Sequence, residues 1–136
     1  MPNHVVARYI DGRMVKGTSL DVAQDRPKFH VREDDGTMTQ VSLSELKALF
    51  FVKSLDGNSE HIEGQEIDAV DPRLRGSRVL EVTFQDGEKI VGLCTRYPPK
   101  GASFFLVPVD SDSNNLRILV NSAALQGMAL VEETND

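Results

Sequence analysis

The sequence contains an internal repeat, and this repeat constrains the possible folds more than any other feature. Similar residues recur at a constant spacing of 75, beginning with Val5 and Leu80. After a short insertion in the second copy the spacing becomes 79, and it holds to Val52 and Val131. Self-similarity at a fixed spacing indicates a repeated supersecondary unit. We therefore expect two copies of one small fold.

Each copy carries the same succession of local signals. It opens with alternating apolar and polar residues, which predict a half-buried strand, and then has Asp-Gly, which favours a tight hairpin turn. The next strand contains a glycine at the same place, Gly17 and Gly92, which predicts a bend or a close backbone contact. Three more strands follow, with one helical turn before the last. The expected strands are 5–10, 13–21, 28–32, 38–43 and 48–52, and then 80–85, 88–96, 103–109, 116–121 and 128–131.

These patterns predict a mostly β protein. We expect two tandem five-stranded small barrels of Sm-like or SH3-like type that arose by internal duplication and pack together. Packing is expected because a unit of about 50 residues buries too little of its own surface. The predicted boundaries are 1–52 for the first barrel, 53–78 for a linker, 79–131 for the second barrel and 132–136 for an acidic tail.

Two sets of motifs resemble known families. Asp11-Gly12-(x4)-Gly17 and its counterpart, which begins at Asp86, resemble the first half of the Sm motif. The run from Leu46 to Lys53, and the run Asp112-Ser113-Asn114-Asn115-Leu116-Arg117, are similar to a bacterial family of uncharacterised proteins. The resemblance implies tandem small barrels, distantly like Sm and PilZ barrels, and it implies no activity.

Three arginines at the end of the linker are the candidate ligand-binding residues. Arg73, Arg75 and Arg78 precede the strand that leads to Asp86, which resembles in outline the arginine-rich lead-in of PilZ domains, which bind cyclic di-GMP. Guanidinium groups can grip phosphates in a bidentate way. Together with Tyr97 in the next loop, they predict a site for a nucleotide or a short RNA. The competing interpretation is a solvated charged face.

Adjacent aromatic residues are the candidate protein-interaction residues. Neighbouring strand residues point to opposite faces, so only one of Phe50 and Phe51 can fill the core of its own barrel. The other packs on the second barrel, binds a partner or stays exposed, and Phe105 poses the same question in the second copy. Packing between the barrels is the competing interpretation for all three.

The composition argues against several functional classes. A net charge of −6 argues against general nucleic-acid binding, which depends on neutralising phosphates. The single cysteine, Cys94, and three scattered histidines give no zinc-site spacing, and we interpret Cys94 as a buried strand residue. We expect no catalytic residues, no metal and no cofactor. No signal-like pattern and no apolar run of about 20 residues is present, so a cytoplasmic location without membrane contact is expected.

The sequence therefore favours a non-catalytic binding or regulatory module, rather than an enzyme. Its expected role is protein–protein interaction in a bacterial cytoplasm, with an unidentified bacterial protein as the partner and homo-oligomerisation left open. The alternative is a binding module for a cyclic dinucleotide, another nucleotide or a short RNA.

Overall fold

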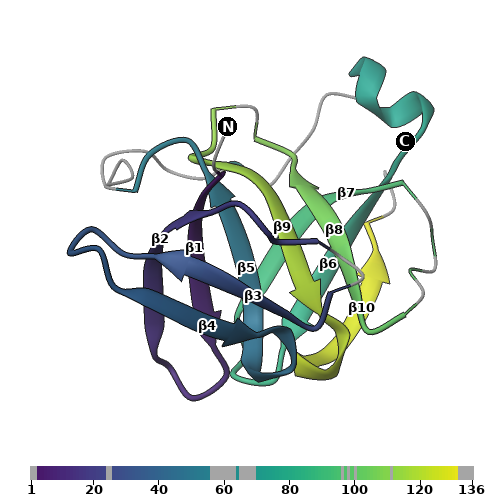
Figure 1. The fold of residues 1–136 in the computed structure, drawn as a ribbon. Coiled ribbons are helices and arrows are strands. Elements are labelled where there is room, and N and C mark those ends of the chain that lie inside the picture. Colours follow the sequence, from purple (N-terminus) through teal and green to yellow (C-terminus); the bar gives the residue numbers. More distant parts are fainter. Residues whose placement is uncertain are drawn as a thin grey trace.

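The computed structural model describes residues 3–23, 26–55, 64, 70–95, 97, 99, 101–110 and 112–131, and most of them lie in ten β-strands (Figure 1). The N-terminal half holds β1 (Asn3–Tyr9), β2 (Met14–Ser19), β3 (Lys28–Arg32), β4 (Met38–Ser42) and β5 (Leu46–Val52). The C-terminal half holds β6 (Arg78–Phe84), β7 (Lys89–Cys94), β8 (Ser103–Pro108), β9 (Asn115–Asn121) and β10 (Leu125–Leu130). The prediction of a mostly β protein is confirmed.

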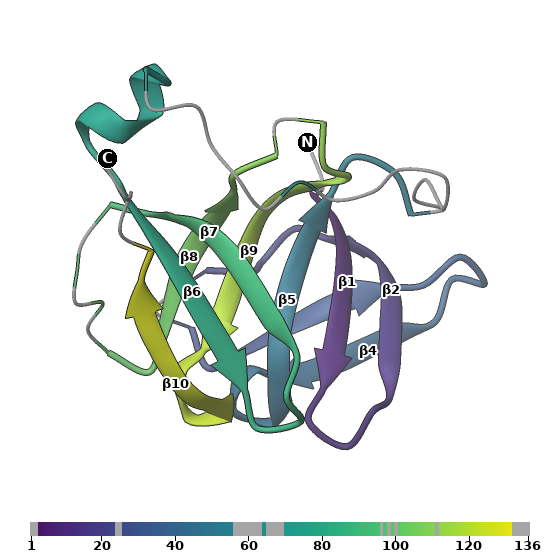
Figure 2. The ribbon, with the colours of Figure 1, turned by 180° about the vertical axis from the view of Figure 1, so that it is seen from behind.

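The ten strands form one antiparallel sheet in the order β10-β6-β7-β8-β9-β5-β1-β2-β3-β4. Each half has its fifth strand beside its first, followed by the second, third and fourth. The halves meet where β9 pairs with β5, with Leu49 opposite Leu119 and Phe50 opposite Ile118. The arrangement is therefore one open sheet (Figure 2). The two halves are joined in it by backbone pairing between β9, the fourth strand of the C-terminal half, and β5, the fifth strand of the N-terminal half.

Local chemistry sets the same bends in both halves. Gly12 and Gly87 close the first hairpins with φ angles of 94° and 93°, a region that favours glycine. A Cβ atom at Gly17 would lie only 2.1 Å from the Arg32 carbonyl oxygen, and one at Gly92 would lie 3.0 Å from the Leu106 Cβ. The second strand can pass this close to the third only because it has no side chain there.

A short 3₁₀ helix precedes the last strand of each half, where one helical turn was predicted. These helices are η1 (Leu43–Glu45) and η3 (Ser122–Ala124), and a third, η2 (Pro72–Arg75), precedes β6. Half of the predicted linker, residues 56–63 and 65–69, and the whole predicted acidic tail, 132–136, lie outside the described residues. Among the described residues, no helix is long and apolar enough to cross a membrane.

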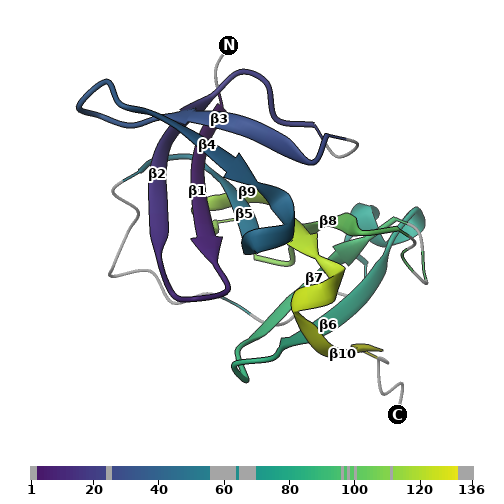
Figure 3. The ribbon, with the colours of Figure 1, turned by 60° about the horizontal axis from the view of Figure 1, so that its bottom comes forward.

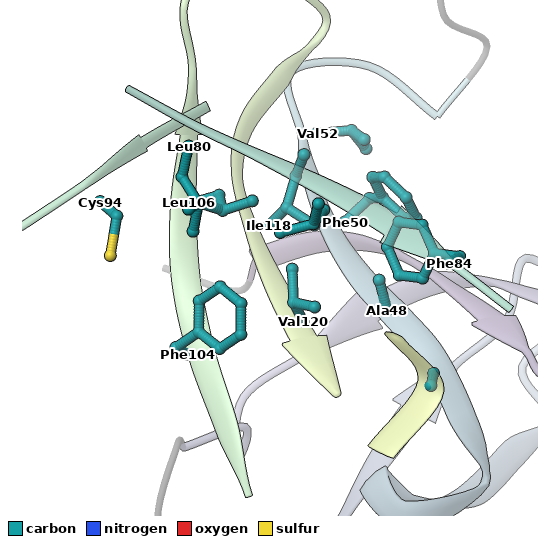
Figure 4. Close-up of a cluster of buried hydrophobic side chains, with 12 residues drawn as sticks. Ala48, Phe50, Val52, Leu80, Phe84, Cys94, Phe104, Leu106, Ile118 and Val120 are labelled. Carbon is teal, nitrogen blue, oxygen red and sulfur yellow. The ribbon is translucent and has the colours of Figure 1, made fainter. Parts of the chain in front are cut away.

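The two larger hydrophobic cores of the described residues lie on opposite faces of the central strands. The N-terminal strands curl over one face and the C-terminal strands over the other (Figure 3). The first core is built mainly from β1, β3, β4 and β5, and it also contains Leu119 of β9. The second is built from β6, β8 and β9, and it also contains Ala48, Phe50 and Val52 of β5 (Figure 4). Each half therefore completes its core with side chains from the other.

The adjacent phenylalanines follow from this arrangement. All seven residues of β5 are buried, and because side chains alternate along a strand, Phe51 enters the first core and Phe50 enters the second. Their side chains are therefore core contacts rather than surface candidates. Phe105 is half-buried and packs against Phe51 with ring centroids 6.0 Å apart. The competing interpretation, packing between the halves, describes all three rings.

Candidate protein-binding surface

A cluster of charged side chains joins the two halves through ion pairs. The register of β1 against β5 shifts between Arg8 and Tyr9, which leaves Lys47 as the extra residue of a bulge. Lys47 is buried, and its Nζ donates to Asp86 Oδ2 at 2.7 Å and also to Glu88 Oε1. Arg8 Nη1 lies 3.2 Å from Glu88 Oε1. The N-terminal half thus supplies two cations to the first hairpin of the C-terminal half.

The neighbouring cations lower the pKa values of the two carboxyl groups in this cluster. The hydrogen bond from Lys47 is the main cause that lowers the pKa of Asp86. Burial raises the pKa of Glu88, but the hydrogen bonds from Lys47 and Arg8 outweigh burial, so that the pKa of Glu88 is also lowered. Both groups are therefore held as carboxylates. A buried ammonium needs such partners because an unpaired buried charge is costly, so the cluster is part of the fold.

The predicted ligand-binding arginines lie in different surroundings. Arg73 Nη1 and Nη2 donate to the carbonyls of Pro108 and Val109 at 3.0 and 2.8 Å, and Nη2 also donates to Asp71 Oδ2 at 2.9 Å. Arg73 therefore fastens η2 to the end of β8. Arg75 is exposed in η2, as is Arg78 at the start of β6.

The other predicted features have separate places. Tyr97 is 41% exposed, in the loop that follows β7. Cys94 is buried at the end of β7, which confirms its interpretation as a buried strand residue. The described residues contain no group of three or more His, Cys, Asp or Glu side chains that could hold a metal ion.

A pocket of about 440 Å³ lies on the outer face of β3, beside the end of the sheet. His30 Nδ1 lies 2.8 Å from Asp21 Oδ2, and this hydrogen bond is the main cause that lowers the pKa of Asp21. Leu20 and Met38 are 81% and 61% exposed. The lining combines apolar contact with charge, and its members are Thr18, Leu20, Asp21, His30, Arg32 and Met38.

A larger hollow of about 500 Å³ lies where the halves meet, between η1 and η3. Its lining is mostly apolar, and Arg26 is its one charged member among the described residues. Asn121 crosses this seam, where its Nδ2 donates to the Leu46 carbonyl at 2.8 Å.

The pocket on β3 borders the outer edge of β4, which is the last strand at one end of the sheet. In the described chain no other strand pairs with this edge. The residues of β4, Met-Thr-Gln-Val-Ser, include no charge and no proline. Natural edge strands usually carry lysine or proline because an open edge can pair with another chain. The edge of β4 and the adjoining pocket form the candidate protein-binding surface.

Sequence reasoning did not find this surface. Met38 and Leu20 are ordinary apolar residues in the sequence, and only the strand order places them at the end of the sheet. For the opposite end of the sheet, at β10, a signal was present in the comparison of the two copies. The fifth strand of the first copy, Leu46–Val52, is more bulky and apolar than its counterpart Leu125–Val131, which contains Gln126 and Gly127. This difference marks one copy's strand as central and the other's as an edge.

The chain belongs to a family of unknown function (DUF6982), whose family model matches residues 1–132. The expectation of an uncharacterised family is thereby confirmed, and no Sm-like or PilZ-like family model matched. Searches of curated proteins and of solved structures gave no match. The function must therefore be argued from the surface itself.

Arg73 is predicted to act in the fold rather than in ligand binding. Arg73→Ala removes charged hydrogen bonds to two carbonyls and should lower the free energy of unfolding by about 2 kcal/mol without any ligand. The matched change Arg75→Ala, at an exposed position, should alter it by no more than about 0.5 kcal/mol. Urea unfolding of both variants measures this. Equal stability of the two variants would contradict the structural role.

The charged cluster predicts a stability difference that depends on pH. Lys47→Met keeps the apolar stem and removes the ammonium, so it should destabilise the protein at neutral pH. Because the pKa values of Asp86 and Glu88 are lowered on folding from 3.8 and 4.5, their contribution is present above those values and is lost as the pH falls. The gap in the free energy of unfolding between wild type and Lys47→Met should therefore shrink on acidification.

Urea unfolding at about pH 7 and about pH 3 measures this gap. Arg13→Met is the control, because it breaks the exposed ion pair with Asp11, and an exposed ion pair contributes little to stability at either pH. A gap for Lys47→Met that stays the same at both pH values would show that the cluster does not act through the two carboxylates.

Proposed function

We propose that this member of the DUF6982 family is a non-catalytic binding module that engages other proteins through the edge of β4 and the adjoining pocket. The observation that carries the proposal is an open, uncharged strand edge beside exposed apolar side chains. An extended segment of a partner can add to such an edge by backbone hydrogen bonds, while alternate side chains enter a neighbouring pocket. The partner is then an extended, mainly apolar protein segment.

The backbone of β4 is oriented for this role. Leu43 N donates to the Pro27 carbonyl, and Thr37 O accepts from Glu33 N, so these two residues point their polar groups toward β3. Because polar groups alternate in direction along an antiparallel strand, Met38 and Gln40 point theirs outward. An added strand would find donors and acceptors at both residues.

We also infer that the two halves derive from one duplicated small-barrel unit of Sm-like or SH3-like type. The repeated strand order, the Asp-Gly hairpins and the 3₁₀ helix before each fifth strand support this origin. The alternative function, binding of a nucleotide or a short RNA by Arg73, Arg75, Arg78 and Tyr97, gains less support, because Arg73 is engaged by Asp71 and two carbonyls.

Selection from a phage-displayed peptide library tests the proposal. The wild-type protein should enrich extended, apolar peptides, and these should lose binding to Gln40→Lys, which places a charge on the exposed edge. Leu116→Lys is the control, because it also places a lysine at an exposed strand position but lies on β9, which is paired along both edges, and it should bind the peptides as wild type does. No enrichment, or equal binding to both variants, would contradict the proposal.

A further inference from the structure

The internal junction of the sheet supplies a template for a second contact. At this junction β9, the fourth strand of its half, pairs with β5, the fifth strand of the other half. The two ends of the sheet are β4, also a fourth strand, and β10, also a fifth strand. Among the described strands, one fourth strand and one fifth strand are therefore open, and they lie at opposite ends of the sheet (Figure 1 and Figure 3).

The open fifth strand repeats the backbone features of the paired one. The register of β10 against β6 shifts between Leu125 and Gly127, at the place that corresponds to the bulge in β5. Like β4, β10 contains no charged residue and no proline. Neither edge strand thus carries the charged residue or the proline that protects many edges against pairing with another chain.

The directions of the backbone N–H and C=O groups show in which register β10 could pair with β4. Val131 N donates to the Val79 carbonyl, so by alternation Met128 and Leu130 point their N–H and C=O groups away from β6. At the internal junction Leu49 pairs with Leu119 and Phe51 pairs with Arg117. With the repeat spacing of 79, the equivalent pairs between β10 and β4 are Met128–Gln40 and Leu130–Met38. Both transferred pairs join residues whose polar groups point outward, as hydrogen-bonded pairs require. A slip of one residue would break this match.

We infer that the partner of the β4 edge is a second copy of this chain, whose β10 pairs antiparallel with β4 in this register. The inference rests on the proposed function, because it names the protein that the surface binds. At the internal junction the Phe51 ring contacts the guanidinium of Arg117 at 4.3 Å and lies 6.0 Å from the Phe105 ring. At the new contact Leu130 takes the place of Phe51, and it meets Met38 and His30 at the pocket.

The contact between copies is weaker than the internal junction. Gly127 and Ala129 stand where β5 places Ala48 and Phe50, so less apolar surface is buried. Each copy also carries a net charge of −6, which opposes association until salt screens it. Association therefore rises with protein concentration and with ionic strength. Because the two surfaces differ, pairing is head-to-tail and does not stop at a dimer.

Sedimentation velocity over a concentration series tests the inference with the full chain. The wild type should exceed the monomer mass of 15.0 kDa by a growing factor as the concentration and the salt rise. Met128→Lys and Gln40→Lys each spoil one edge, so each should remain at the monomer mass alone. Leu116→Lys, the exposed control on central β9, should associate as wild type does.

Two further samples test the head-to-tail geometry. An equimolar mixture of Met128→Lys and Gln40→Lys retains one intact β4 edge and one intact β10 edge, so it should reach twice the monomer mass and go no further. The double variant Met128→Lys with Gln40→Glu places opposite charges at paired positions and should recover association. Recovery also shows that the single variants failed through the contact and not through unfolding.

Wild type that stays at the monomer mass throughout, or association that the edge variants do not change, would overturn the inference. The peptide selection then separates the two proposals. Gln40-dependent peptide binding by a monomeric protein leaves the proposed function standing with a different partner. The absence of both association and peptide binding removes both proposals.

Discussion

The structure depends on β5, a strand that is paired along both edges and buried on both faces. Its backbone bonds to β1 on one side and to β9 on the other. Its side chains alternate between the two cores, with Leu49 and Phe51 in one and Phe50 and Val52 in the other. Removing either set would expose apolar surface in both halves, because each core is closed partly by the neighbouring half. Burial, rather than a linker, makes the two halves one unit.

The same logic explains Lys47, which is the one buried charged residue in the described part of the chain. A lysine in a fully buried strand is tolerated only with carboxylates close by, and the bulge aims Lys47 at the hairpin that carries Asp86 and Glu88. At the corresponding bulge of β10 the residue is Gln126, which is exposed. The central strand β5 is thus bulkier than the terminal strand β10 and carries a charged residue, because β5 is buried and β10 is largely exposed.

The sequence predicted what local chemistry decides. The Asp-Gly hairpins, the close approach at Gly17 and the bounds of β3, residues 28–32, all follow from turn and strand preferences. The pairing of β9 with β5 could not be predicted, because strands so distant in the chain carry no local signal of their partner. For that reason the sequence left three outcomes open for Phe50 and Phe51, and only the strand order decided between them.

The candidate surface is less predictable still. The sequence singled out Arg73, which turned out to be engaged by Asp71 and backbone carbonyls, because charge patterns do not show which cations the fold itself uses. The β4 edge differs in kind, because β4 carries no charged residue and no other described strand pairs with its outer side. Such a feature becomes visible only when the ends of the sheet are known.

The most direct test of a shared central strand is scanning calorimetry of the dilute full chain. If β5 closes both cores, the two halves must unfold together, in one transition whose calorimetric and van't Hoff enthalpies agree. Two separate transitions, or a calorimetric enthalpy well above the van't Hoff value, would show that each half folds on its own and would contradict the account.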